Sequence, residues 1–184
     1  MIHVLLDTND IPHLLFIIVT FVIGHVERIL LSNAKQSSTN FAAPYAIDKD
    51  TDGFGSTTGC AETDNHHNVN WWQGKFDRIY MNIRMRLMPR NDCCKGRYTR
   101  VKVFVGTDGY TWELCEDLGN SLKTSNTWVD ANCPKYMKAK YVKVALHNKE
   151  RFALCELEAW GLPLGNILLY SIPMINAFQY NKCR

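Results

Sequence analysis

Apolar and polar side chains alternate with a period of two through residues 79–87, IYMNIRMRL, and this alternation constrains the fold of the chain strongly. Successive side chains of a β-strand point to opposite faces, so the pattern predicts a strand with one face buried and the other in water. The residues expected on the buried face are Ile79, Met81, Ile83, Met85 and Leu87, and those expected in water are Tyr80, Asn82, Arg84 and Arg86.

Other stretches repeat this signal along the middle of the chain. They are RVKVFVG at 100–106, KYVKVAL at 140–146 and FALCELEAWGL at 152–162, and GTDGYTWEL at 106–114 holds a turn signal at Asp108-Gly109. Short strands separated by turn residues indicate an all-β sandwich rather than a helical or α/β fold.

The two ends of the 184-residue chain differ from this middle region. Residues 11–24 form an apolar run with the length of a signal-peptide h-region, which predicts a leader over residues 1–24. The ten residues before the run contain no Lys or Arg, so a buried strand and a membrane anchor stay open as alternatives. Residues 162–184 form an irregular apolar tail, interrupted by Pro173, whose role the sequence leaves open.

Charge and cysteine content narrow the class of protein. The formal net charge is only +3 and the basic residues are scattered, so neither nucleic-acid binding nor stable membrane insertion is expected. The seven cysteines include no CxxC pair, and three disulfides plus one odd thiol, Cys183, is the simplest arrangement. Disulfides favour an oxidising compartment and a secreted protein, the alternative being a reduced protein with buried thiols.

Several segments of the middle region resemble the F-type lectins, which are fucose-binding lectins of the discoidin-like superfamily. The segments are KQSST at 35–39, YAIDKDTDG at 45–53, NWWQGKF at 70–76, RNDCC at 90–94 followed by Arg97, and LCELEAWG at 154–161. They occur in the family's order and cover residues 33–161. The resemblance implies a discoidin-like (jelly-roll) β-sandwich stapled by disulfides, pairing Cys60 with Cys155, Cys93 with Cys94 and Cys115 with Cys133.

The resemblance also implies a sugar site around RNDCCKGR at 90–97. Arg90 and Arg97 would donate hydrogen bonds to neighbouring hydroxyls of fucose, because the guanidinium group is a fork-shaped donor. Asp92 would accept from one or both arginines and fix their orientation. The ring closed by Cys93 and Cys94 would pack against the sugar. An ordinary surface ion pair is the alternative for these charged groups.

This chain departs from the family's pattern at the residue that makes the third sugar contact. The family has a histidine where this chain has Glu62. The Glu62 carboxylate could accept hydrogen bonds from sugar hydroxyls, or it could pair with Arg90 and block the pocket. His66 and His67, a few residues on, are candidate replacements for the histidine. Phe54 is a candidate for the apolar wall that receives the methyl group of fucose.

The segment at 45–53 resembles the family's calcium loop. Calcium prefers hard oxygen ligands, including backbone carbonyls of irregular loops. The ligands that the resemblance implies are the carbonyls of Tyr45 and Asp50, the side chain of Asp48, a carbonyl from Gly59 or Cys155, and the side chain of Glu156.

The expectation is therefore a secreted, calcium-dependent lectin that binds terminal L-fucose or a related sugar on glycoconjugates, in innate recognition or cell adhesion. A shallow single site binds weakly, so useful avidity would require a homo-oligomer. The alternative is a discoidin-like adhesion module that binds another glycan, a lipid or a protein. No enzyme is expected, because Asp92 between two arginines should stay ionised, whereas glycoside hydrolysis needs a carboxyl with a raised pKa.

Overall fold

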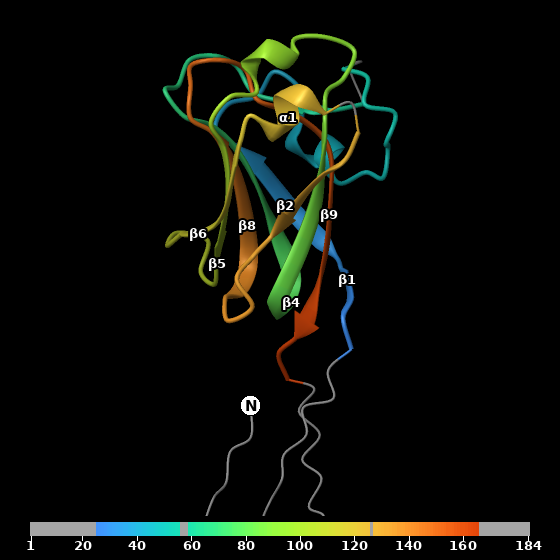
Figure 1. The fold of residues 1–184 in the computed structure, drawn as a ribbon, viewed down its shortest axis with the longest axis vertical. Helices are drawn as coiled ribbons and strands as arrows, with labels where there is room; N and C mark the ends of the chain where they lie inside the picture. The colour runs from blue at the N-terminus through green and yellow to red at the C-terminus, as the bar shows by residue number, and fades with distance from the viewer. Residues whose placement is uncertain (1–24, 56–58, 126, 166–184) are drawn as a thin grey trace, which may run out of the picture. The chain divides into compact units, whose positions relative to one another are not determined.

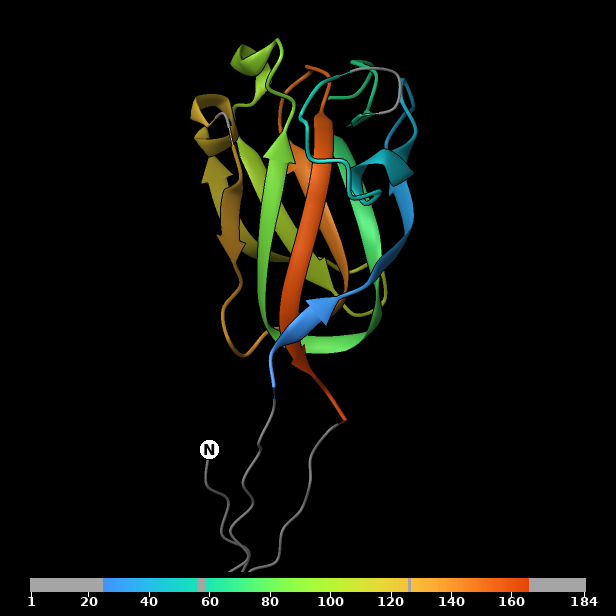
Figure 2. The same ribbon diagram turned by 90° about the vertical axis from the view of Figure 1, so that its right-hand side faces the viewer.

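The structure is a computed structural model that describes residues 25–55, 59–125 and 127–165. Its longest strand, β4 (Asn70–Pro89), belongs to both layers of a β-sandwich. The first half of β4 pairs with β2 and β8, and the second half pairs with β7 and β9. Figure 2 shows the green strand turning from one layer to the other at the lower end of the sandwich.

The remaining strands extend these two layers (Figure 1). From β8 one layer continues to β5 and β6, and in the other layer β9 also pairs with β1 and β3. Their bounds are β1 Glu27–Ile29, β2 Leu31–Gln36, β3 Ala61–Glu62, β5 Val101–Gly106, β6 Glu113–Gly119, β7 Val129–Asn132, β8 Lys138–Leu146 and β9 Ala153–Pro163. Helical structure is limited to three short segments, η1 Ala43–Ala46, η2 Lys95–Arg97 and α1 Ser121–Thr124, in the part of the chain described.

The alternation expected across residues 79–87 is correct in its second half and wrong in its first. Ile83, Met85 and Leu87 are buried as expected, but Tyr80 is buried as well, while Ile79 and Met81 are only half buried. The cause lies at Asn82, where φ is 50° and the pairing with β9 shifts register between Met81 and Arg84. An extra residue at such a bulge exchanges the two faces of the strand.

The other expected strands are confirmed, and their apolar faces form the core between the layers. Two valine rows from neighbouring strands of one layer are almost fully buried, with the side chains of Trp72, Phe76 and Leu157 against them. The rows are Val101, Val103 and Val105 in β5 and Val142 and Val144 in β8. The predicted turn at Asp108-Gly109 is present, with φ of 81° at Gly109.

The structure joins six cysteines in the pairs that the resemblance implies, including the adjacent Cys93 and Cys94. The expected leader over residues 1–24 and the odd Cys183 lie outside the described residues.

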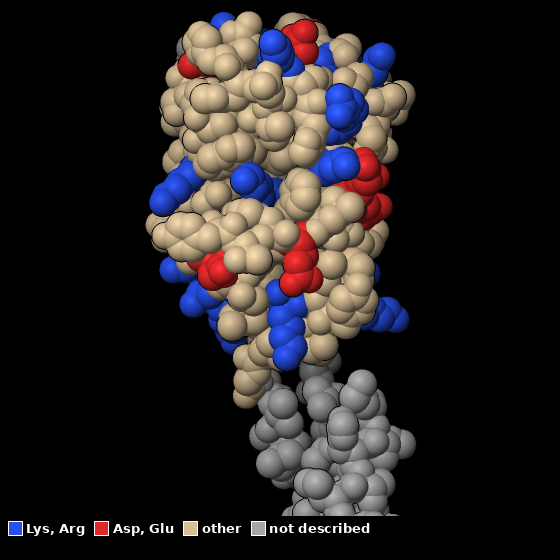
Figure 3. All heavy atoms as spheres, turned by 90° about the vertical axis from the view of Figure 1, so that its left-hand side faces the viewer, with Lys and Arg blue, Asp and Glu red and all other residues tan. Residues whose placement is uncertain are grey.

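Within the described ranges, no helix is both long and apolar enough to cross a membrane. On the face shown in Figure 3, basic side chains are spread among uncharged and acidic ones.

Candidate functional site

Three segments that are distant in the sequence meet at the loop end of the sandwich, at the top of Figure 1. Glu62 lies on β3, Arg90 directly follows β4, Arg97 ends η2, and Arg151 precedes β9. The pairing of β3 with β9 sets Glu62 opposite Ala153, and so brings the loop that holds Arg151 to the same place.

Glu62 is the centre of this cluster, and it is only 2% exposed. Its Oε2 atom accepts from Arg90 Nη1 at 2.8 Å and from Arg97 Nη2 at 3.4 Å. Its Oε1 atom accepts from Asn40 Nδ2 at 3.3 Å and from Arg151 Nη1 at 3.5 Å. Of the two roles that the sequence leaves open for this carboxylate, the structure shows the pairing with Arg90, and it adds two further arginines.

These arginines keep the buried carboxylate ionised. Burial alone would raise the pKa of Glu62, but the charges of Arg97 and Arg90 and their hydrogen bonds outweigh it, and the pKa lies below the ordinary 4.5. A buried ion is stable only when its partners compensate for lost hydration. Glu62 therefore acts as an anchor that positions arginines.

The lowered pKa of Glu62 predicts a loss of stability in acid. The ion pairs stabilise the fold above the unfolded-state pKa, and this contribution is lost as pH falls through the folded-state pKa, below 4.5. Urea unfolding at a series of pH values should show the wild type losing stability more steeply below pH 4.5 than Glu62→Gln. Parallel curves for the two proteins would contradict the assignment.

Arg90 is held on several sides. Besides Glu62, it contacts Asp92 through Nε at 2.7 Å and Nη2 at 3.1 Å, a bidentate pair. Gly55 packs directly against the guanidinium group, so that a Cβ atom there would stand 1.8 Å from Arg90 Nε. The hydrogen bond from Arg90 also lowers the pKa of Asp92. Asp92 fixes the orientation of Arg90 as expected, and its side-chain hydrogen bonds are with Arg90 rather than Arg97.

Tyr98 fixes the loop that holds the two cysteines, a role that the sequence analysis missed. Its buried hydroxyl donates to the carbonyl of Ala153 at 3.0 Å and accepts from the backbone N–H of Arg90 at 3.2 Å. The guanidinium of Arg97 lies over its ring at 5.4 Å. An isolated tyrosine after a polar loop gives no sequence signal for these hydrogen bonds.

A hollow of about 370 Å³ lies directly beside the vicinal disulfide. Arg97 is 8% exposed in its side chain, and its Nε atom has no hydrogen-bond partner among the described residues. Arg151 is more open, at 46%. The hollow thus combines a flat disulfide edge with guanidinium groups; it is lined by Asn65, Cys94, Gly96, Arg97, Glu150 and Arg151.

Of the predicted sugar contacts, Cys94 and Arg97 line this hollow, whereas Phe54, His66 and His67 do not. Phe54 is 56% exposed, and His66 and His67 are exposed. The Nδ1 atom of His66 lies 3.9 Å from the Oδ2 atom of Asp64. Arg151 stands instead among the lining residues. Sequence analysis missed it because its proximity to Glu62 depends on the pairing of β3 with β9.

The loop expected to bind calcium contacts a buried acid, Glu156. Glu156 is 2% exposed, and its Oε2 atom accepts the backbone N–H of Lys49 at 3.0 Å. Burial, together with the charges of Asp48 and Glu158, raises the pKa of Glu156 to about 7. The Asp48 Oδ1 atom accepts the N–H of Asp50 at 2.9 Å, which closes a tight turn.

The donors expected in this loop are oxygen atoms, the ligand type that a hard cation prefers. No group of three or more His, Cys, Asp and Glu side chains in the described ranges is arranged to hold a metal ion. A calcium ion here would depend on the two carboxylates and on backbone carbonyls, such as those of Tyr45 and Asp50, as the resemblance implies. Burial of the Glu156 carboxyl near Asp48, which raises its pKa to about 7, is the observation that favours an ion, because a bound cation would stabilise the ionised form.

Several solved structures share this fold. A fucose binding module of Streptococcus pneumoniae superposes with a TM-score of 0.63 at 20% identity, over 71% of this chain and 91% of the module. A fucolectin from the serum of striped bass, Morone saxatilis, gives 0.58 at 18%, over 71% and 45%. The lectin domain of lectinolysin, solved with Lewis B antigen, gives 0.58 at 21%, over 69% and 90%.

At such low identity these likenesses establish the fold alone. Among curated proteins, a search found no match to the chain. The sequence model of the F5/8 type C domain, in contrast, matches residues 32–157, which run from β2 into β9 and include Glu62, Arg90, Arg97 and Arg151. The chain therefore belongs to the F5/8 type C domain family, the discoidin-like β-sandwich proteins.

Proposed function

We propose that this protein is a carbohydrate-binding lectin whose ligand is a terminal L-fucose or a related sugar on a glycoconjugate. The observation that supports it best is the 370 Å³ hollow that places Cys94 beside Arg97 and Arg151. The fucose-binding proteins among its structural neighbours make fucose the first sugar to test.

The hollow offers what a sugar requires in water, namely rigid donors beside a flat surface. Glu62 holds Arg97 and Arg151 from below and leaves their remaining N–H groups as donors for hydroxyl oxygens. The edge of the Cys93–Cys94 ring supplies the surface on which an apolar sugar face packs. Arg151 takes the place of the third donor that the histidine of the F-type lectins would supply.

The electrostatics of the site favour binding over hydrolysis. Glycosidases need one carboxyl group whose raised pKa keeps it protonated as the general acid. The pKa values of Glu62 and Asp92 are both lowered by the arginines, so both carboxylates are ionised at neutral pH. The acidic pair thus holds donors in place and supplies no proton.

A second candidate is an adhesion module of the same fold that binds another glycan, a lipid or a protein. The ion pairs of Arg90 favour this candidate. Its side chain is 16% exposed and is already paired with both Glu62 and Asp92. If Arg90 cannot reach a ligand, the fucose contacts of the F-type lectins are incomplete.

A glycan array probed with the full chain, with and without a calcium chelator, separates the two candidates. Binding to fucosylated glycans that is lost in Arg151→Ala supports the lectin. Lys138→Ala, an exposed position far from the loop end on β8, is the matched control and should bind normally. Undiminished binding in Arg151→Ala would reject the proposed hollow, and no binding to any fucosylated glycan would favour the adhesion module.

Calcium is proposed as a structural ion that steadies the loop next to the arginine cluster. Gly53 accepts the backbone N–H of Asn91 at 3.0 Å, which connects the acidic loop to the sugar loop. When bound, the ion would supply positive charge to the carboxylates of Glu156 and Asp48, and these residues hold the loop in place.

Removal of calcium should therefore lower the melting temperature. At a free calcium concentration of about one hundred times Kd, binding stabilises the fold by about 2.7 kcal/mol, or roughly 5–10 °C for a domain of this size. Differential scanning calorimetry with calcium and with a chelator measures the shift. Glu156→Gln should abolish it, and an equal shift in that variant would place any ion elsewhere.

Secretion and oligomerisation belong to the same proposal. The three disulfides support an oxidising compartment. A single shallow hollow implies a Kd in the micromolar to millimolar range, about −8 to −4 kcal/mol, so firm attachment to a glycosylated surface would come from several copies.

A further inference from the structure

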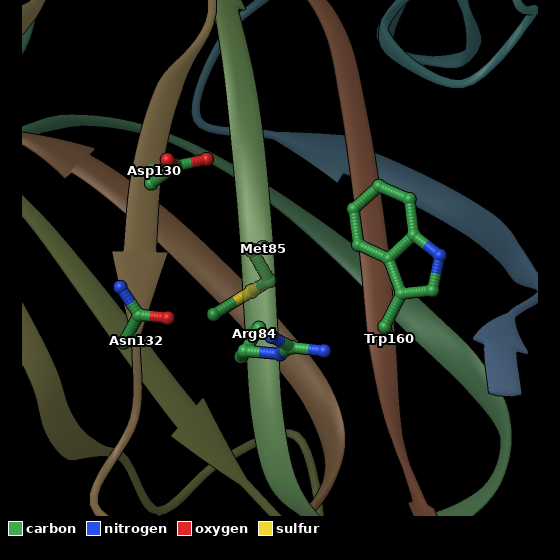
Figure 4. Close-up of a pocket in the computed structure, with 5 residues that line it drawn as sticks. All are labelled: Arg84, Met85, Asp130, Asn132 and Trp160. Carbon is green, nitrogen blue, oxygen red and sulfur yellow. The ribbon is translucent and has the colours of Figure 1, made fainter. Parts of the chain in front are cut away.

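A second hollow, of about 290 Å³, lies on the outer face of the layer that contains β7, β4 and β9 (Figure 4). Strand register creates it, because Arg84 on β4 is paired with Asn132 on β7 and with Trp160 on β9. Asp130 lies two residues before Asn132 on the same strand, and so faces the same side. The hollow is lined by Arg84, Met85, Asp130, Asn132 and Trp160.

The polar side chains that line this hollow are available to a ligand. Among the residues that the structure describes, the side chains of Arg84, Asp130 and Asn132 make no hydrogen bond or ion pair, and all three residues are exposed. Their neighbours differ. Arg28 donates to Glu158 at 2.7 Å, and Arg86 also donates to Glu158. That carboxylate is therefore already shared, and the charge of Arg84 stays available to a ligand.

Trp160 supplies a flat apolar surface beside these groups. Figure 4 shows the indole along β9 with its broad face toward the viewer, and Arg84 between it and the two polar residues of β7. The guanidinium of Arg86 stands 5.3 Å from the centroid of the ring and also lies 4.2 Å from that of Trp128. Arg86 thus supports the indole at an otherwise solvated sheet face.

We infer that this hollow is a second sugar site, for a neutral pyranose unit, distinct from the loop-end hollow. A pyranose presents an apolar C–H face, which Trp160 can stack against, and hydroxyls that both donate and accept. Arg84 donates, Asp130 accepts and Asn132 does both. The charges of Arg84 and Asp130 cancel, so a neutral sugar fits better than an acidic one.

The geometry of the sheet is compatible with this ligand. The strands β7 and β9 flank β4, so they stand about 10 Å apart, a span that places hydrogen-bonding groups on one side and the indole on the other. Arg84 precedes Arg90 by six residues along the chain, or roughly 20 Å of extended strand. The inference does not depend on fucose binding at the loop end, and two weak sites on one chain would add avidity toward a glycan surface.

The test is a titration of the full ¹⁵N-labelled chain, followed through the indole N–H signals of its five tryptophans. The probes are D-glucose, D-galactose, D-mannose, lactose and cellobiose, with D-glucuronate as the charged comparator. We expect at least one neutral sugar to shift the Trp160 signal and to leave that of Trp112 unchanged. Asp130→Ala and Arg84→Ala should each weaken the apparent Kd about tenfold, the loss of one hydrogen bond to a charged group.

Controls separate this site from the loop-end hollow. Arg151→Ala should leave the Trp160 response intact, and Trp112→Ala, the same kind of residue on the other layer, should not change the affinity. The inference is overturned if no neutral sugar shifts the Trp160 signal, or if the shift survives unchanged in both Asp130→Ala and Arg84→Ala. A loss of the response in Arg151→Ala, or a stronger response to D-glucuronate than to D-glucose, would also overturn it.

Discussion

Replacing Glu62 with alanine should lower the free energy of unfolding by about 3–5 kcal/mol, the cost of removing one partner from a buried ion pair. The carboxylate is 2% exposed and receives hydrogen bonds from Arg90, Arg97 and Arg151. Without it, Arg97 keeps a positive charge in a side chain that is 8% exposed. Urea unfolding followed by circular dichroism measures the change.

Two comparison variants isolate the effect of the buried charge. Asp92→Ala removes a carboxylate that is 26% exposed and pairs with Arg90, so it should cost only about 1 kcal/mol. Glu62→Gln keeps the shape and some hydrogen bonding, and should fall between the two. If Glu62→Ala costs no more than Asp92→Ala, Glu62 does not anchor the arginines.

Loss of the Cys60–Cys155 disulfide should have a similarly large effect. This link joins residues 95 apart in the sequence, and the chain-entropy model assigns about 4–5 kcal/mol to a loop of this length. It also links the residue directly before β3, the short strand that holds Glu62, to β9. Cys60→Ala combined with Cys155→Ala should therefore unfold at a markedly lower denaturant concentration.

The other two disulfides provide matched controls because their loops are shorter. Cys115 and Cys133 are 18 residues apart, and their removal should cost about 3 kcal/mol. Cys93 and Cys94 are adjacent, so removal of their link should change stability by less than about 1 kcal/mol. An equal loss of stability from all three double variants would show that loop length does not govern their contributions.

The strands were predictable because their signal is local. Val101–Val105 and Val142–Val144 alternate on the expected faces, since regular strands of the sandwich present one face to the core. The failure at Ile79–Met81 came from the bulge at Asn82. The pairing of β4 with β8 and with β9 shifts register on either side of Tyr80 and Met81, and a polar residue within an alternating run does not predict such shifts.

Several residues of the site could be predicted from the sequence, but the contacts between them could not. The motif at 90–97 identified Arg90, Arg97 and Asp92 as neighbours, because they lie on one loop. The choice between sugar acceptor and arginine partner for Glu62 depended on contacts across 28 and 35 residues of sequence. Arg151, 89 residues from Glu62, joined the cluster only through the pairing of β3 and β9.

The central claim is that the hollow beside Cys93 and Cys94 binds the sugar, and titration calorimetry with L-fucose tests it most directly. The full chain should bind L-fucose with a Kd in the micromolar to millimolar range. The Cys93→Ser, Cys94→Ser double variant should keep its fold and lose at least about tenfold in affinity, since the flat ring that packs on the sugar is gone. Equal affinity in the two proteins, or no binding of L-fucose by the full chain, would contradict the claim.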